Sequence, residues 1–191
     1  MAIDTPGTYQ QFAFLRNGAK RVDTIVADGA QTTRVYDPTN PNQSVDFIFD
    51  KGAFFATPDN TIDLGNPYYR FRDLYVASGI INTSDERQKK DMSPLDKIKD
   101  FFMSLNPVKY RYIDGTSGRM HHGLGAREVE QAMLANGLTD MDFAGLIKSP
   151  DEENEGEYIY GLRYTEFIPM LIKMVQDQQR KINALEARGS L

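Results

Sequence analysis

The stretch that divides the chain reads Asn82-Thr83-Ser84-Asp85-Glu86-Arg87-Gln88-Lys89-Lys90-Asp91, and the amino-acid composition changes within it. Residues 1–83 contain no Glu, whereas residues 84–191 contain all 9. Seven of the 8 Met also follow residue 84, while Thr splits 9 against 3 in favour of the first part. Because Glu and Met favour helices and Thr favours strands and turns, we expect an α+β protein, β-rich over 1–83 and helix-rich over 84–191.

The first 83 residues alternate short strand-type runs with turn signals rich in Asp, Asn, Pro and Gly. The predicted strands are Thr24–Val26, Thr33–Tyr36 and Val45–Phe49. Independent stability needs three or more strands with a shared apolar face, and strands this short bury little apolar surface within one chain. We therefore expect residues 1–83 to be a segment of a larger, oligomeric β-structure.

Helix and hairpin signals dominate residues 84–191. Ser93 and Pro94 suit the cap and first position of a helix whose apolar residues continue at helical spacing to Leu105. Asn136-Gly137 closes a second predicted helix. This second helix is predicted over 126–135. The other predicted elements are strands over 108–113, 143–148 and 158–162, and an exposed acidic turn over 151–155.

The last predicted helix, from Thr165 to Ala187, carries a heptad pattern. Its seam positions are Ile168, Val175 and Ile182 at a, and Leu171, Gln178 and Leu185 at d. A polar stretch over 176–181 leaves little apolar surface outside this seam. We expect an oligomeric coiled coil, and the alternative is an amphipathic helix that packs on its own domain.

Composition and motifs exclude several classes of function. The net charge of −5 argues against binding of nucleic acid through phosphate contacts, and no apolar run approaches the ~20 residues that span a bilayer. The absence of Cys excludes disulfides, a thiol nucleophile and Cys-based zinc sites. The only histidines, His121 and His122, are adjacent and lack metal-ligand spacing. We expect no metal and no cofactor, since phosphate-binding loops and Gly-x-Ser-x-Gly elbows are also absent.

The dividing stretch resembles the start of a known domain. Ser84-Asp85-x-Arg87-x-Lys89 is similar to the Ser-Asp-x-Arg-x-Lys motif that opens the intramolecular chaperone of phage endosialidases, tail fibres and neck appendages, the S74 peptidase family. Stretches over 106–112, 122–129 and 160–164 agree with that family in order and spacing, although Gly125 and Arg127 depart from its usual residues. Residues 63–75 resemble a repeat that ends phage fibres, with Phe71 in place of its usual Trp.

The resemblance implies that the two parts of the chain have different functions. Residues 1–83 would form a trimeric, intertwined β-stalk of the β-helix or β-prism type. Residues 84–191 would form a chaperone with a β-hairpin and a long coiled-coil helix, whose partners are the homotrimer and the upstream fibre. The family cleaves itself once per chain just before the Ser of the motif, which here is the Thr83–Ser84 bond. The fibre part would remain in a virion tail fibre or appendage after assembly in the host cytoplasm.

Ser84 and Lys89 carry the expected chemistry. A Ser hydroxyl attacks only when a base removes its proton, and a Lys can be that base when its pKa falls from ~10.4 towards 7–8. The resemblance selects Lys89 over Lys90, and Arg87 is a further neighbouring cation. Side chains five residues apart diverge on a helix or a strand, so the pair meets only if the chain turns between them or if two subunits meet. We expect folding and trimerisation to complete the site.

Four residues are candidates for supporting roles. Asp85 either orients Lys89 or caps the following turn. Glu128 and Arg163 resemble positions that matter in the family, as oxyanion or orienting groups, and a buried structural ion pair is the alternative for each. His122 is expected to pack or to form a hydrogen bond at the domain interface.

Two other functions stay open from the sequence. A non-cleaving trimerisation and attachment module of a fibre would keep the heptads and the β-stalk, with Ser84 and Lys89 in a polar linker. A carbohydrate-binding tip would use aromatic surfaces, with packing of the same side chains in the stalk core as the alternative. The aromatic residues concerned are Tyr68, Tyr69, Phe71 and Tyr75.

Overall fold

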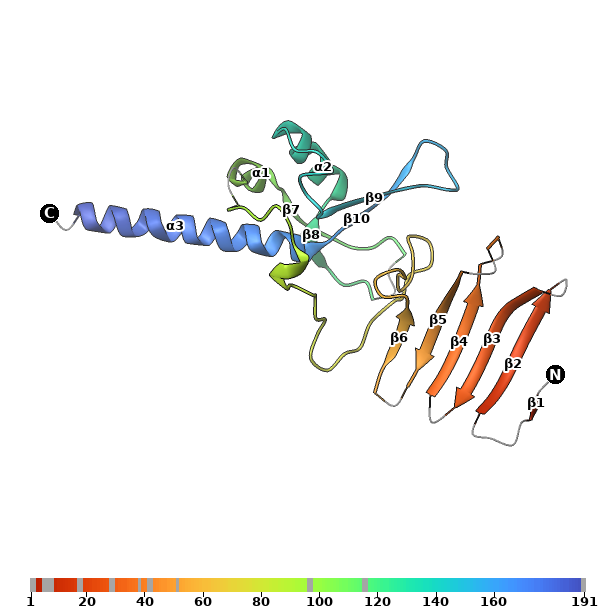
Figure 1. The fold of residues 1–191 in the computed structure, drawn as a ribbon. Coiled ribbons are helices and arrows are strands. Elements are labelled where there is room, and N and C mark those ends of the chain that lie inside the picture. The colour runs from red at the N-terminus through yellow and green to blue at the C-terminus, as the bar shows by residue number, and fades with distance from the viewer. Residues whose placement is uncertain are drawn as a thin grey trace. The chain divides into compact units, whose positions relative to one another are not determined.

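The computed structural model describes residues 3–4, 9–16, 19–27, 30–37, 39–40, 43–50, 52–95, 98–114 and 117–189. Contacts divide the chain into two compact units, residues 1–72 and 73–191 (Figure 1). The predicted mixture of sheet and helix is confirmed, with the six-stranded sheet in the first unit and all α-helices of the described residues in the second. This division falls before residue 84, and the domain boundary between residues 83 and 84 stays a prediction.

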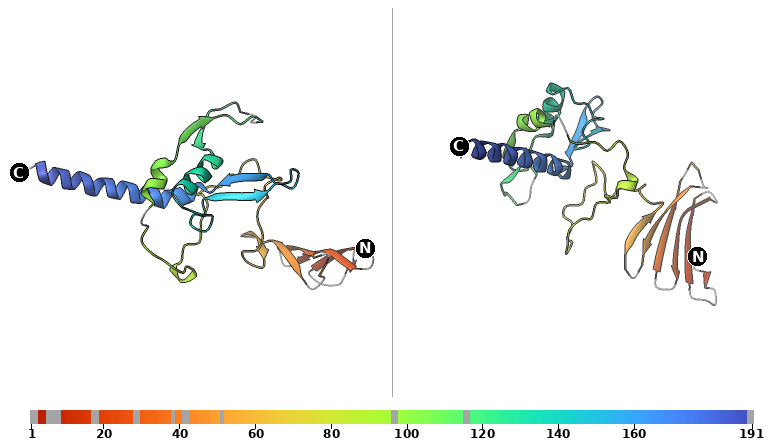
Figure 2. Two further views of the ribbon diagram at one scale, coloured as in Figure 1. Left: turned by 90° about the horizontal axis from the view of Figure 1, so that it is seen from above. Right: turned by 60° about the vertical axis from the view of Figure 1, so that its left-hand side comes forward.

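The first unit is a single antiparallel sheet in which each strand pairs with the next one along the chain (Figures 1 and 2). Its strands are β1 (Ile3–Asp4), β2 (Tyr9–Arg16), β3 (Ala19–Ala27), β4 (Ala30–Tyr36), β5 (Ser44–Phe49) and β6 (Phe54–Thr57). The three strands expected from the sequence lie within β3, β4 and β5, because their β-branched and aromatic residues favour a pleated sheet.

Alternation along the strands gives this sheet two different faces. On one face Arg34 donates through Nε and Nη2 to the two carboxylate oxygens of Asp46, both at 2.7 Å. On the other face Phe54 stacks with Phe49 and Phe47, with ring centroids 4.5 and 6.5 Å apart. Roughly half of Phe49 and of Phe54 is exposed. One sheet layer thus leaves apolar surface open, and the trimeric stalk stays a prediction.

The second unit combines helices with two β-hairpins (Figure 1). Its elements are η1 (Glu86–Gln88), α1 (Lys99–Ser104), β7 (Pro107–Tyr110), β8 (His121–Leu124), α2 (Ala126–Ala135), β9 (Leu146–Pro150), β10 (Tyr158–Leu162), η2 (Tyr164–Glu166) and α3 (Phe167–Gly189). Strand β7 pairs with β8, and β9 pairs with β10. The acidic residues 151–155 form the exposed connection of the β9–β10 hairpin, as expected.

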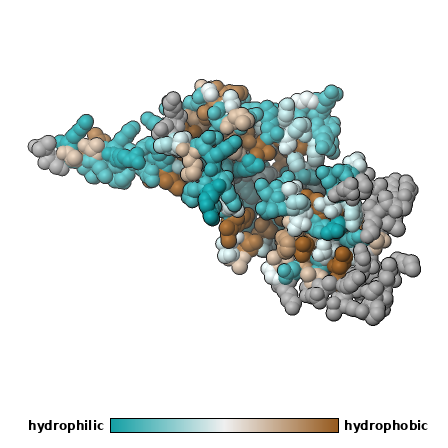
Figure 3. Space-filling view, viewed as in Figure 1, coloured by the Kyte–Doolittle hydropathy of each residue, from teal (hydrophilic) through white to brown (hydrophobic). Residues whose placement is uncertain are grey.

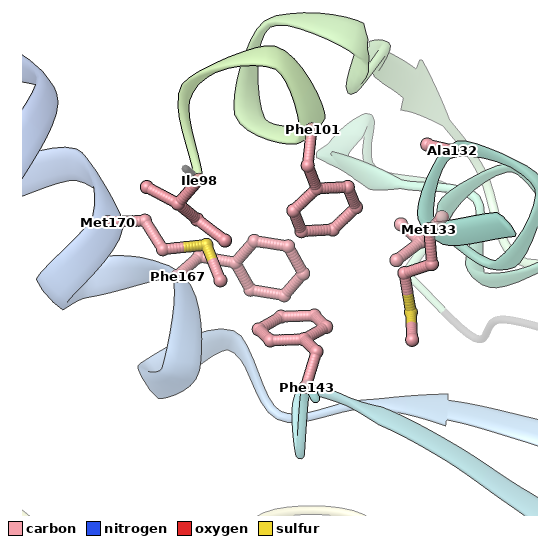
Figure 4. Packing of buried hydrophobic residues seen from close by; sticks show 8 residues of the cluster. Ile98, Phe101, Ala132, Met133, Phe143, Phe167 and Met170 are labelled. Atoms are coloured by element: carbon pink, nitrogen blue, oxygen red, sulfur yellow. The ribbon is translucent and has the colours of Figure 1, made fainter. Parts of the chain in front are cut away.

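The core of the second unit joins α1, α2, α3 and the loop before β9 (Figure 4). Phe101 of α1 is fully buried, and its ring lies edge-on to Phe143 with centroids 5.3 Å apart. Phe143 in turn lies edge-on to Phe167, at 5.1 Å. The other buried members of the cluster are Ile98, Val129, Ala132, Met133 and Met170. These contacts fix the start of α3 against both short helices.

Helix α1 begins later than expected. The predicted start at Pro94 is wrong, because α1 begins at Lys99, after Ile98. Leu95 remains 37% exposed, whereas Ile98 and Phe101 are buried. The helix therefore starts where core packing starts, and packing outweighs the local preference of the Ser-Pro pair.

Other boundaries differ by a few residues. Helix α2 has the predicted bounds, and Gly137 after it adopts a positive φ of 70°, as a helix-ending glycine does. Strand β7 ends at Tyr110 rather than at residue 113. Strand β9 begins at Leu146, because Phe143 turns into the core instead of pairing.

Helix α3 starts in the core and then leaves it. Within α3, Phe167, Met170 and Met174 are buried, and the later turns extend beyond the other elements of the second unit (Figure 1). In the space-filling view this extension is mostly hydrophilic with separate apolar residues (Figure 3). The heptad positions from Ile168 to Leu185 are exposed, and the coiled coil stays a prediction. In the described ranges, no helix has the length and apolarity that crossing a membrane requires.

Candidate active site

A single 3₁₀ turn separates Ser84 from Lys89. The backbone N–H of Gln88 donates to the carbonyl of Asp85 at 3.1 Å, and the N–H of Lys89 donates to the carbonyl of Glu86 at 3.0 Å. Asp85 precedes the turn with extended backbone, and its Oδ1 accepts from the N–H of Arg87 at 2.9 Å. An Asp is suited to this capping role because its short side chain satisfies an amide that lacks a helical partner.

The turn brings the side chain of Lys89 back to Ser84. Lys89 Nζ lies 2.8 Å from Ser84 Oγ and 3.2 Å from the carbonyl oxygen of Ser84. Both contacts are within one chain. The sequence spacing allowed the pair to meet either through a turn of the chain or between two subunits, and in this structure a turn brings them together. The distance between Nζ and Oγ is short enough for proton transfer.

Asp85 also binds the guanidinium group of Arg87. Arg87 Nε lies 3.0 and 3.1 Å from the two carboxylate oxygens, and Arg87 Nη2 donates to Oδ2. The hydrogen bonds from Arg87 lower the pKa of the Asp85 carboxyl, and the charge of Lys89 lowers it further. Sequence reasoning considered Arg87 as a cation acting on Lys89 and missed this pairing. An Asp two residues before an Arg in a turn was the signal available for it.

The pair lies at the surface of the single chain. Ser84 and Lys89 are both exposed, and the turn η1 between them contains no buried residue. Thr83, on the other side of the predicted scissile bond, is exposed as well, in a segment without helix or strand. This exposure leaves the bond accessible but leaves the amine of Lys89 in water.

Glu128 and Arg163 lie on other elements of the second unit. Glu128 is in the first turn of α2, where its Oε2 accepts from Asn106 Nδ2 at 3.4 Å. Arg163 Nη1 donates to the carbonyl of Ala144 at 3.2 Å. Both side chains are exposed, so the alternative of buried ion pairs is wrong for this chain. Across the described residues, neither side chain forms a hydrogen bond with the Ser–Lys pair.

The two histidines point to different surroundings. His122 is exposed on β8, whereas His121 stacks with Tyr110 at 5.6 Å and lies edge-on to Tyr112 at 5.1 Å. Within this chain, packing is therefore the role of His121 rather than His122. In the part of the chain that the structure describes, no group of three or more His, Asp or Glu residues is placed to hold a metal ion.

Comparisons with known proteins agree with the resemblance. Residues 84–138 match the family model described as chaperone of endosialidase. A curated relative, the capsule K3-specific depolymerase 1 of Klebsiella phage KP32, is 32% identical over 106 residues. That match covers 52% of this chain and 12% of the relative, so the chain spans only a small part of that protein.

A solved structure extends the likeness to the fold of the whole chain. The carboxy-terminal domain of the bacteriophage T5 L-shaped tail fibre, solved with its intra-molecular chaperone domain, is similar at a TM-score of 0.70 and 15% identity. The match covers 100% of this chain and 56% of that one. At this identity the likeness concerns the fold alone. The family match beginning at Ser84 confirms the resemblance drawn from the sequence, since residues 84–138 are similar to the family described as chaperone of endosialidase.

Proposed function

We propose that residues 84–191 are the intramolecular chaperone of a phage tail fibre or depolymerase and that they cut themselves from residues 1–83 between Thr83 and Ser84. The observation that carries this proposal is the 2.8 Å contact between Ser84 Oγ and Lys89 Nζ. Two findings support it: the family match starts at residue 84, and the two matched proteins described above are phage proteins.

The reaction proceeds through an ester. Lys89, in its neutral form, takes the proton from Ser84 Oγ, which attacks the carbonyl carbon of Thr83. The Thr83 C–N bond breaks, the nitrogen of Ser84 receives the proton from Lys89, and a Thr83–Ser84 Oγ ester remains. Water then hydrolyses the ester, which leaves a carboxylate on Thr83 and restores the hydroxyl of Ser84. Each chain reacts once, so the protein is an autoprotease without external substrates.

Assembly would control the reaction. A Lys is neutral at ordinary pH only where burial or nearby cations disfavour its charge, and Lys89 is exposed in the single chain. A neighbouring copy that covers the η1 turn would remove water from the pair. Cleavage would then occur in the assembled protein and would leave unassembled chains intact.

Helix α3 would supply the assembly. Its heptad residues lie outside the core contacts, with Ile168 at 52% and Ile182 at 47% exposure. A trimeric coil built on this seam would hold three copies of residues 1–83 at high local concentration. That helps a β-structure with interchain pairing, which otherwise folds slowly and risks an incorrect register. Cleavage would finally make unfolding of the fibre hard to reverse.

Denaturing electrophoresis of purified chains tests the proposal. Wild type should yield fragments of 83 and 108 residues, while Ser84→Ala and Lys89→Ala should each remain whole at 191 residues. Lys89→Arg is a matched variant, because it keeps the positive charge but cannot serve as the base. Lys90→Ala is the control for the neighbouring lysine and should be cleaved like wild type.

Two outcomes would count against the mechanism. An assembled wild type that remains a single 191-residue band would favour the non-cleaving trimerisation module instead. Cleavage of Lys89→Arg at the wild-type rate would show that another group removes the proton.

A further inference from the structure

The turn that joins Ser84 to Lys89 has little support from the rest of the protein. It consists of three residues, none of them buried, and residues 73–83 and 89–95 on either side form no helix or strand. A 3₁₀ segment of this length has poor hydrogen-bond geometry and rarely holds by itself. Local side-chain contacts must therefore hold the position of Lys89 relative to Ser84.

One carboxylate supplies most of those contacts. Asp85 Oδ1 accepts from the backbone N–H of Arg87 at 2.9 Å, and the same oxygen accepts from Arg87 Nε at 3.0 Å. The second oxygen, Oδ2, accepts from Nη2. A planar guanidinium meets a carboxylate in this two-pronged way with a defined orientation, which a Lys cannot reproduce.

The contacts of Lys89 separate its role from that of Asp85. Among the described residues, the Lys89 ammonium donates its hydrogen bonds to Ser84, to the Oγ and to the carbonyl oxygen. In the described parts of the chain, Asp85 forms no hydrogen bond with Lys89, so it does not orient the amine directly. Arg87 is likewise turned onto Asp85, which offsets its charge.

We infer that Asp85 and Arg87 act as one clamp that positions Lys89 against Ser84. This inference rests on the proposed cleavage and adds two positioning residues to it. The clamp holds the turn closed from within the chain, before any neighbouring copy covers the site. A small misplacement of reacting groups is enough to slow a reaction about 100-fold, so loss of the clamp should affect cleavage strongly even though an exposed ion pair adds little to overall stability.

The test is a cycle of cleavage rates on the full 191-residue chain. Asp85→Ala and Arg87→Ala should each slow cleavage by about 10- to 100-fold, and the double variant should be no slower than the slower single variant. Arg87→Lys should behave like Arg87→Ala, because it keeps the positive charge but loses the two-pronged contact of the guanidinium with Asp85. Glu86→Gln, on the same exposed turn, is the matched control and should match wild type.

The pH dependence distinguishes positioning from an electrostatic effect. If Arg87 positions the turn, Arg87→Ala lowers the rate at every pH and leaves the shape of the pH profile unchanged. A shift of that profile to higher pH, with Arg87→Lys close to wild type, would show that Arg87 acts by its charge on Lys89 and would overturn the clamp. Rate losses that multiply in the double variant would overturn it as well, since they would show two independent roles.

An NMR measurement tests the clamp independently of the cleavage reaction. In a Ser84→Ala background, NMR should show a protected Arg87 Nε–H and a nuclear Overhauser contact between residue 84 and the Lys89 side chain. Asp85→Ala should abolish both signals, whereas Glu86→Gln should keep them. If wild type is not cleaved but these signals behave as stated, the proposed cleavage fails and the clamp stands. If the signals survive Asp85→Ala, the clamp fails whatever the cleavage result.

Discussion

Met174 and Val175 are adjacent in α3, yet only 6% of Met174 is exposed against 55% of Val175. The helix therefore has a buried apolar face beside an exposed apolar face. One face packs on the core of the second unit, and the other carries the heptad seam. We expect substitutions on the first face to change folding stability and substitutions on the second to change association.

Met174→Ala should lower the free energy of unfolding by about 2–5 kcal/mol, because it removes a buried side chain and leaves a cavity. Urea denaturation followed by circular dichroism measures this change. Gln176→Ala is the matched control on the same turn of the helix, where the side chain is exposed. Equal destabilisation by both variants would contradict the assignment of the core-facing side.

Ile182→Asn should weaken association by roughly 10-fold or more, because it places a polar group in the seam beyond the core contacts. The helical content of the chain should change little. Sedimentation at several protein concentrations measures the distribution of oligomers. Lys181→Ala, one residue outside the seam, should behave like wild type. An unchanged distribution for Ile182→Asn would remove α3 as the association element.

Glu130→Gln should lower the free energy of unfolding by about 1–2 kcal/mol. Glu130 of α2 lies 2.6 Å from Lys148 Nζ of β9 and accepts from the Tyr160 hydroxyl of β10 at 2.8 Å. This carboxylate thus ties the β9–β10 hairpin to α2. Thermal unfolding measures the effect, and Glu128→Gln in the same helix is the control, since Glu128 is exposed.

The contribution of Glu130 should depend on pH. The hydrogen bond from Lys148, and then that from Tyr160, lower the pKa of Glu130 in the folded protein from its ordinary value of 4.5. Its stabilisation is therefore complete above that pH and is lost as the pH falls through the lower folded pKa. The difference between wild type and Glu130→Gln should be largest near neutral pH and should shrink below about pH 4.5. A difference that grows in acid would contradict the ion pair.

Gly123→Ala should destabilise the second unit by about 1–3 kcal/mol. A Cβ at this position of β8 would collide with the hydroxyl of Tyr164, which accepts from the N–H of Leu124 at 3.0 Å. Adding Tyr164→Phe should recover part of the loss, because it removes the colliding oxygen. Thermal unfolding of the two single variants and the double variant measures this recovery. A loss that simply adds to that of Tyr164→Phe would show that the collision is not the cause.

The fold followed from the sequence where local pattern and packing agree. Helix α2 combined a regular apolar face with the stop signal of Asn136-Gly137, and its bounds were predicted correctly. Helix α1 was predicted with the wrong start, since the cap and Pro signals at residues 93–94 lie outside the packed core. Such a start depends on Phe143 and Phe167, which are distant in sequence and come together only in the folded unit.

The candidate site was identified by motif, but its geometry was not. The spacing of Ser84 and Lys89 required either a turn of the chain or a second subunit to bring them together. It did not distinguish the two, because a three-residue turn held by side chains has no clear sequence pattern. The pairing of Asp85 with Arg87 was also missed, although an Asp two residues before an Arg was a signal for it. In residues 1–72, runs of β-branched residues allowed strands to be predicted. What covers the face that carries Phe49 and Phe54 could not be predicted, because it depends on parts distant in sequence or on other chains.

Intact-mass spectrometry of the purified, assembled wild-type protein, combined with N-terminal sequencing, tests the central claim most directly. Cleavage between Thr83 and Ser84 should give two polypeptides, of which the 108-residue one begins at Ser84 and the 83-residue one ends at Thr83 with a free carboxylate. A single 191-residue mass in the assembled protein, or a new N-terminus at any residue other than Ser84, would contradict it.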